Sequence, residues 1–205
     1  MKYHLEYPEL ANALYFALKQ DAFYQTMEAS VVGDKAARKS AMLGYMDFSI
    51  LEAQKYGECF VPEKQNYGVS IWGKPLQPEE LATKHRLKKN FITQHMGSRS
   101  FEVYQNICQF MSSKSAELIA DNAWYLSIIG ILPEFQGQGL GPGLIESVLN
   151  KTDALGVSTY LETFTSRNKA FYFRLGYEVV GNFTEPNTEA EYWLLQRQPV
   201  SLSES

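Results

Sequence analysis

Cysteine is scarce in this sequence, and the two cysteines present do not form a recognisable site. Cys59 and Cys108 lie far apart, with no Cys-x-x-Cys pair and no neighbouring histidine cluster. This spacing excludes a disulfide framework and a structural zinc site. We expect two buried thiols in a reducing compartment, with a bridge as the alternative. His4, His85 and His95 are too scattered to propose a metal site.

A surplus of basic residues and a long apolar run are also missing. The formal net charge is -4 and the pI is near 5.5, which does not favour nucleic acid as a partner, because phosphate-backbone binding needs a basic surface. The basic run at residues 84–89 is expected to be a solvated helix face. No run approaches the ~20 apolar residues that span a bilayer, and the N-terminus lacks the apolar stretch of a signal peptide. We therefore expect a cytoplasmic protein with no membrane partner.

The composition that is present is that of an ordinary globular protein. With 205 residues, 45% of them hydrophobic, the chain can fill one core with short insertions. We predict a single domain over residues 1–197. Residues 198–205 have no periodicity and should form a flexible tail that frays.

The first half of the chain alternates between helical and strand patterns. Residues 58–61 and 67–72 read as two strands around a turn at residues 62–66, which predicts an antiparallel hairpin. Apolar residues recur at helical spacing over residues 10–28, 35–55, 79–96 and 101–120.

The second half predicts a strand–helix–strand unit followed by a hairpin. A nearly continuous apolar run at residues 124–131 is typical of a central strand. The next helix presents Leu140, Leu144, Val148 and Leu155 on one side and ends at Gly156. The remaining elements are a strand at 158–163, a short helix capped by Ser166 and stopped by Gly176, and strands at 177–183 and 190–195. This order predicts an α/β fold with a mixed central sheet flanked by helices.

A glycine cluster separates the predicted central strand from the helix that follows it. Glycines occupy every second position from 137 to 143, where the chain must turn tightly. The first N–H groups of a helix have no internal partner and lie at the positive end of its dipole, so they bind anions. Glycine permits close approach, and Pro142 suits a first helical turn. The cluster predicts a phosphate-binding loop; the alternative is a turn that only packs a helix on the sheet.

The glycine spacing excludes two better-known phosphate loops. A dinucleotide Gly-x-Gly-x-x-Gly motif would need glycine in place of Pro142 or Leu144. A Walker A loop would need Gly-Lys followed by Ser or Thr, which is absent there. The observed spacing is Gln136-x-x-Gly139-x-Gly141, preceded by Ile131-x-Pro133.

This spacing resembles the pyrophosphate-binding motif of the GNAT superfamily of acetyl-CoA-dependent N-acetyltransferases. A second segment, residues 160–177, is similar to the superfamily's Leu-Glu-Thr…Asn…Phe-Tyr…Leu-Gly-Phe segment. Within the superfamily, its residues resemble most closely those of the puromycin N-acetyltransferase branch. The match covers residues 122–196, with weaker support near residue 70. Ala123 stands where that branch often has histidine, and Tyr177 replaces a phenylalanine.

The resemblance implies acetyl-CoA as the donor, with CoA as product, and a GNAT-like fold. It divides the chain into an acceptor side at residues 1–121 and an acyl-CoA-binding core at 122–197. The residues that it matches to cofactor contacts are Ile129, Gly130, Ile131, Gln136, Gly137, Gln138, Gly139, Leu140, Gly141, Asn168 and Tyr172. In the family the central strand splays from its neighbour and pairs with the pantetheine arm, and Gly130 would ease that kink. Asn168 has helix capping as its alternative.

Catalysis requires a base for the ammonium group and an acid for the departing thiolate. Tyr172 matches the family tyrosine that faces the cofactor sulfur, with core packing as the alternative. Glu162 is the candidate base, directly or through water, with an exposed or structurally paired carboxylate as the alternative. Glu134, in the turn, is a weaker candidate. No metal is required.

We therefore expect acetyl transfer to the primary amine of a small molecule by direct attack in a ternary complex. The alternatives are an acyl-CoA-binding sensor or pseudoenzyme without turnover, and a protein or peptide N-acetyltransferase. Trp72, Tyr104 and Tyr125 are candidates for lining the acceptor pocket, with core packing as the alternative. The identity of the amine, the acyl-chain preference and the oligomeric state are not readable from the sequence.

Overall fold

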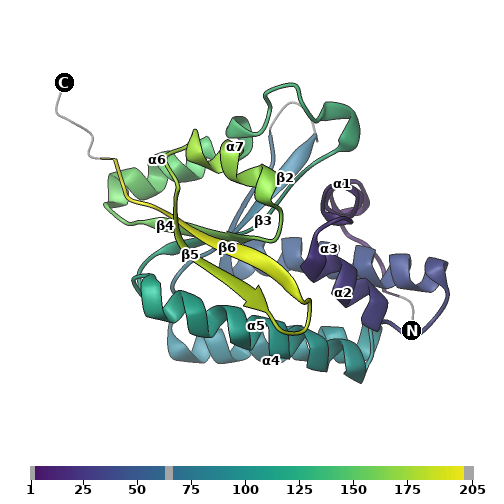
Figure 1. Cartoon of the computed structure of the whole chain (residues 1–205). Coiled ribbons are helices and arrows are strands. Elements are labelled where there is room, and N and C mark those ends of the chain that lie inside the picture. The colour runs from purple at the N-terminus through teal and green to yellow at the C-terminus, as the bar shows by residue number, and fades with distance from the viewer. Residues whose placement is uncertain (1–2, 63–66, 201–205) are drawn as a thin grey trace.

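A six-stranded mixed sheet organises the computed structural model, which describes residues 3–62 and 67–200 (Figure 1). Its strand order is β1-β2-β3-β4-β6-β5. The strands are β1 (Gly57–Phe60), β2 (Gly68–Gly73), β3 (Trp124–Ile131), β4 (Thr159–Thr163), β5 (Glu178–Glu185) and β6 (Ala190–Arg197). All neighbours pair antiparallel except β3 and β4. The predicted mixed sheet, with its hairpins, is confirmed. Residues 63–66 of the predicted turn lie outside the described residues, as do residues 201–205 of the predicted tail.

The single parallel pair, β3 with β4, is short. Register partners run only from Trp124 opposite Thr159 to Leu126 opposite Leu161. Since β3 continues to Ile131, its last five residues have no partner on β4. The predicted splay of the central strand is therefore present, and it opens one edge of β3 at its C-terminal end.

Helices cover both faces of the sheet. Figure 1 shows α6 and α7 on one side of the sheet and α4 and α5 side by side on the other. The helices are α1 (Pro8–Leu18), α2 (Ala22–Ser30), α3 (Lys35–Tyr56), α4 (Pro78–His95), α5 (Ser98–Leu118), α6 (Glu146–Leu155) and α7 (Lys169–Phe173). One buried cluster joins α1–α4 to β2 and β3, and a second joins β2–β4 and β6 to α6 and α7. Burial of these two clusters clamps the sheet between helical layers.

The predicted helix at residues 10–28 is wrong, because the chain breaks at Asp21. Its carboxylate accepts a hydrogen bond from the amide of Phe23 at 3.0 Å and so caps α2. The apolar spacing continues across the break, so periodicity alone does not reveal that the helix ends there. Two shorter helices result, with Asp21 at the corner between them.

The helix after the glycine cluster begins later than expected. Gly141 to Ile145 form a 3-10 turn, η2 (Pro142–Leu144), and α6 starts only at Glu146. The carbonyl of Leu144 accepts a hydrogen bond from the Ser70 hydroxyl at 2.6 Å, which ties this turn to β2 instead of to a helical amide. Gly156 does end α6 in the left-handed region, with φ of 65°.

Two smaller expectations need correction. Ser166 is the first residue of the 3-10 turn η3 (Ser166–Asn168) and makes no capping hydrogen bond. The basic run at residues 84–89 is largely exposed, as expected, but Lys88 within it is buried and pairs with Glu52 of α3.

The cysteines and the helices bear on two further expectations. Cys59 and Cys108 are both free and partly buried. Burial raises the pKa of Cys59 to about 11 and that of Cys108 to about 12, so both thiols stay protonated at neutral pH.

Within the described ranges, no helix has the length and apolar character needed to cross a membrane.

Candidate active site

The glycine loop is exposed and leaves a row of backbone amides available to a ligand. The amide of Gln136 donates to the carbonyl of Pro133 at 3.2 Å, so this one amide is not free. The Gln136 side chain donates to the carbonyl of Ile131 at the end of β3 at 2.9 Å, and the Gln138 side chain donates to the carbonyl of Glu134 at 2.8 Å, which steadies the loop. Within residues 3–62 and 67–200, the amides of residues 137–141 have no hydrogen-bond acceptor. Unpaired donors of this kind are what a bound anion satisfies.

The backbone of this loop has the alternating geometry of an anion-binding concavity. Gly137 and Gly139 both have φ of 74°, whereas Gln138 between them does not have positive φ. This alternation turns successive N–H groups toward one side. Gly141 has a different role, because a Cβ there would lie 2.7 Å from the ring of Phe171. The loop therefore packs directly on α7.

A groove of about 660 Å³ extends from the loop along the open edge of β3 to α7. We call it the donor groove. Ile129, Gly130 and Ile131 form its floor, and Asn168 and Tyr172 lie on its α7 side. The predicted cofactor residues Gly137, Gly139, Leu140 and Gly141 also line it.

Two arginines of the donor groove were missed by the sequence reading. Arg167 and Arg174 are exposed and line the groove near the loop. Their positive charge adds to the field of the free amides and favours an anionic ligand such as a diphosphate. The sequence gives little indication of their role, because only the fold brings these two arginines to the groove that the glycines line.

Gly130 is needed for close packing of α1 against the sheet. A Cβ at this position would lie 2.8 Å from Cδ2 of Leu14 and 3.1 Å from Cβ of Ala17. The structure thus gives a packing reason for this glycine, beyond the expected easing of a kink. Close contact between α1 and β3 brings the end of α1 to the wall of the donor groove.

A second cavity, of about 280 Å³, lies on the other side of Tyr172; we call it the central chamber. Glu162 of β4 faces it. One carboxylate oxygen of Glu162 accepts a hydrogen bond from the Tyr125 hydroxyl at 3.0 Å. The other, Oε1, is buried and has no partner in the part of the chain that the structure describes. Burial raises the pKa of Glu162 to about 7, despite the opposing hydrogen bond from Tyr125.

Tyr172 is buried on α7 and lines both the donor groove and the central chamber. Burial raises the pKa of its hydroxyl, which therefore stays protonated at neutral pH. A core-facing pair of Phe171 and Leu175, with Tyr172 to one side, is the expectation from helical spacing, and it is wrong: Tyr172 belongs to the buried core cluster, and Phe171 and Leu175 are only partly buried against it. The groove and the chamber share one wall, formed by Leu18, Asp21, Ile129, Asn168 and Tyr172.

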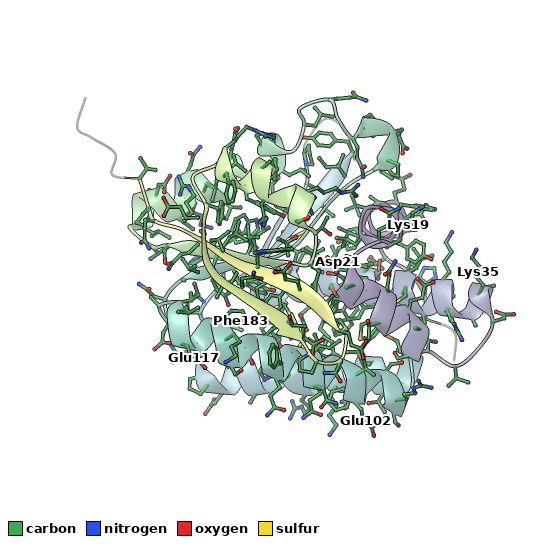
Figure 2. All side chains as sticks on the ribbon, in the orientation of Figure 1. Lys19, Asp21, Lys35, Glu102, Glu117 and Phe183 are labelled. Carbon is green, nitrogen blue, oxygen red and sulfur yellow. The ribbon has the colours of Figure 1, made fainter. Side chains whose placement is uncertain are left out.

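Leu18 and Asp21 are the residues of this wall that the sequence did not predict, and Asp21 is the one that can ionise; its position was assigned to a helix interior. Figure 2 shows it at the start of α2, between the N-terminal helices and the sheet. Burial raises its pKa to about 6, although backbone amides including that of Phe23 oppose the shift. The chamber therefore carries two carboxyl groups, Asp21 and Glu162, whose pKa values lie close to neutrality.

The remaining sequence candidates divide between the cavities and the core. Tyr104 and Tyr125 line the central chamber. The Trp72 indole is buried and donates to the Ser70 hydroxyl at 3.0 Å, and Trp72 also lines a neighbouring cavity of about 160 Å³. Glu134 lies in the exposed turn η1 (Pro133–Phe135). Across residues 3–62 and 67–200, no group of three or more histidine, cysteine or acidic side chains is placed to hold a metal ion.

Comparison with known proteins finds a domain match over part of the chain and a shared fold. Residues 101–179 match the family model described as an acetyltransferase (GNAT) domain. The structure described as histone acetyltransferase HPA2 and related acetyltransferase, from Corynebacterium glutamicum, is 15% identical with a TM-score of 0.63, covering 97% of this chain and 94% of that one. Arylalkylamine N-acetyltransferase 2 from Aedes aegypti is 12% identical with a TM-score of 0.59, covering 98% of each chain. An agmatine N-acetyltransferase is 16% identical with a TM-score of 0.52, covering 96% of this chain and 97% of its own.

The likenesses to solved structures establish the fold. The sheet and its flanking helices match GNAT acetyltransferase folds, as the sequence predicted. The domain match over residues 101–179 supports an acyltransferase. The identities are too low to transfer a substrate from any of these proteins.

Proposed function

We propose that this protein transfers an acetyl group from acetyl-CoA to the primary amine of a small molecule, by direct attack while both substrates are bound. The observation that carries the proposal is the shared wall between the donor groove and the central chamber. A donor lying in the groove and an amine lying in the chamber would meet at Tyr172. Catalysis by direct transfer needs this proximity.

The residues present fit the donor. The free amides of residues 137–141 would hold its diphosphate, and Arg167 and Arg174 would neutralise phosphate charge. The unpaired edge of β3 offers backbone groups of residues 129–131 to the pantetheine arm. Asn168 borders the same path. When bound, acetyl-CoA supplies a thioester that an amine can attack.

Two side chains would move the protons of the transfer. Glu162 accepts a proton from the ammonium group, and a pKa of about 7 suits a base that works near neutral pH. Tyr172 would donate its hydroxyl proton to the departing sulfur and regain the second proton of the amine nitrogen, which becomes acidic as the amide bond forms and the carbon–sulfur bond breaks. The proton taken up by Glu162 is then the one proton released to solvent overall.

The central chamber favours a small cationic acceptor over a peptide. Six tyrosines line it, together with Asp21 and Glu162, and aromatic faces and carboxylates both attract ammonium groups. Its volume of about 280 Å³ suits a compact amine. The closer likeness to puromycin N-acetyltransferases, a cytoplasmic location and a single catalytic domain over residues 1–197 stay predictions from the sequence.

The test is to mix the protein with acetyl-CoA and a panel of small amines and to follow free thiol. We expect thiol release that depends on the amine and acetylated amine in equal amount. Tight CoA binding with no thiol release for any amine would favour a sensor. Release only with peptides carrying a free N-terminus or lysine would favour a protein acetyltransferase.

A further inference from the structure

A third cavity, of about 160 Å³, adjoins the central chamber. We call it the distal chamber. It shares Tyr45, Tyr104, Tyr125, Ser127 and Ile128 with the central chamber, so these side chains border both cavities. A molecule whose amine lies at Glu162 would reach the distal chamber by passing between them. What it meets there is an ion pair.

The far wall of the distal chamber carries Glu52 of α3 and Lys88 of α4. The Lys88 ammonium lies 3.3 Å from Oε2 of Glu52, and the two side chains are 8% and 12% exposed. Burial lowers the pKa of Lys88, and the charge of Glu52 opposes that shift. A buried pair of this kind is costly to desolvate and needs its remaining polar atoms satisfied.

Lys88 has its partners within the protein. Its ammonium donates to Oε2 of Glu52 and to the Ser49 hydroxyl at 3.2 Å. It also lies 4.9 Å from the ring centres of Tyr45 and Phe48, which face its remaining side. The lysine therefore has little capacity left for a ligand.

Glu52 is not satisfied in the same way. Its second oxygen, Oε1, is buried and has no hydrogen-bond partner among the described residues. An unpaired buried carboxylate oxygen is rare, because an oxygen that loses its water and gains no hydrogen bond costs the full desolvation free energy of that atom. Since Glu52 lines the distal chamber, a ligand can supply the missing donor.

We infer that the distal chamber is a second recognition site for the acceptor, which takes a neutral hydrogen-bond donor of the substrate, a hydroxyl or an amide N–H, at Oε1 of Glu52. The inference rests on the proposed function, because it places the reactive amine of the same molecule at Glu162. The donor is neutral because Lys88 already balances the charge of Glu52, and Lys84 and His85 also line this chamber. A second ammonium group in this chamber would lose its hydration and lie close to the positive charge of the neighbouring lysines, and both effects are unfavourable.

The substrate class that follows is an amine bearing a hydroxyl or amide at a distance, as in a long amino alcohol, and not a simple diamine. The test uses linear amino alcohols of increasing length, each paired with the alkylamine and the diamine of the same length. Binding is measured by calorimetry in the presence of CoA, and turnover by thiol release from acetyl-CoA. At the best length, the amino alcohol should bind about tenfold more tightly than either partner, as one buried hydrogen bond predicts.

A double variant removes the proposed hydrogen-bond acceptor of the distal chamber without leaving a buried charge unpaired. Glu52→Leu with Lys88→Met replaces the ion pair by apolar side chains of similar size, a change that buried pairs often tolerate. We expect it to abolish the preference for the amino alcohol. Lys89→Met, which removes a charge from an exposed position on the same helix, should keep the preference. Circular dichroism and thermal melting check that both variants fold; if the double variant does not, the wild-type series alone decides.

The outcomes separate this inference from the proposed function. Thiol release without any preference at any length, a preference for the diamine, no binding by any amino alcohol, or a preference that survives in a folded double variant would each overturn the inference. A binding preference without thiol release would leave the recognition site standing and count against the transferase.

Discussion

Replacing Glu162 with glutamine should make the protein more stable above neutral pH and much less active. Burial raises the pKa of this carboxyl from 4.5 to about 7. Because the pKa is higher in the folded state than in the unfolded state, ionising Glu162 opposes folding. The cost is absent at low pH, grows as the pH rises from about 4.5 to about 7, and is constant above that.

The size of this cost follows from the pKa of Glu162 in the unfolded and folded states. Each pKa unit corresponds to about 1.4 kcal/mol, so the difference between a pKa of 4.5 and a pKa of about 7 corresponds to about 3 kcal/mol. Glutamine keeps an oxygen for the Tyr125 hydroxyl and stays neutral. Glu162→Gln should therefore raise the free energy of unfolding by about 1–3 kcal/mol at pH 8 and change it little at pH 4.5.

Urea unfolding at the two pH values measures the stability part of the prediction. The activity part needs kcat/KM as a function of pH. In the wild type, kcat/KM should rise as Glu162 loses its proton near pH 7, and the variant should lose this rise together with about a hundredfold or more of the rate. A stability gain that is equal at both pH values would refute the raised pKa. Unchanged turnover would refute the role of Glu162 as the base.

Asp21→Asn is the matched control, since Asp21 faces the same chamber and its pKa is raised to about 6. Asparagine also caps helices, so the start of α2 should survive. We expect this variant to keep the rise near pH 7. Loss of the rise in Asp21→Asn, and not in Glu162→Gln, would transfer the role of base to Asp21.

Two further variants test the acid and the loop. Tyr172→Phe should lower kcat by about a hundredfold with little change in the Kd for CoA, because it removes the proton donor and not the groove; Tyr177→Phe, which alters a buried tyrosine bonded to Thr159 at 2.8 Å, should keep most of the rate. Equal rates for the two variants would remove Tyr172 as the acid. Gly139→Val should weaken CoA binding by about tenfold or more, because φ of 74° is strained for a branched side chain, so the loop must change its backbone and the direction of its free amides. Calorimetry with CoA measures this loss, and an unaltered Kd would argue against the loop as the diphosphate site.

Local pattern was enough to predict most helices and all six strands. The two short strand patterns of the β1–β2 hairpin, the apolar run of β3 and the stop at Gly156 each depend on neighbouring residues alone. The errors occurred where a side chain overrode the pattern. Asp21 caps α2 inside an unbroken apolar period, and Ser70 binds the carbonyl of Leu144 from another strand. Lys88 appeared solvated by its charge, yet it pairs with a residue of α3.

The sequence by itself determined that a glycine loop lies between a buried strand and a helix, because backbone freedom at Gly137 and Gly139 is a property of the residue type. The resemblance of residues 160–177 to the superfamily segment also marked Tyr172, and the place of Glu162 near the end of the next predicted strand made it the candidate base. Only the tertiary structure decided that Tyr172 joins two cavities, that Asp21 lies beside it, and that an oxygen of Glu52 is left unpaired. The physical reason is that burial and pairing depend on which elements pack together, and charges far apart along the chain acquire their pKa values and partners only when the sheet brings them into one space.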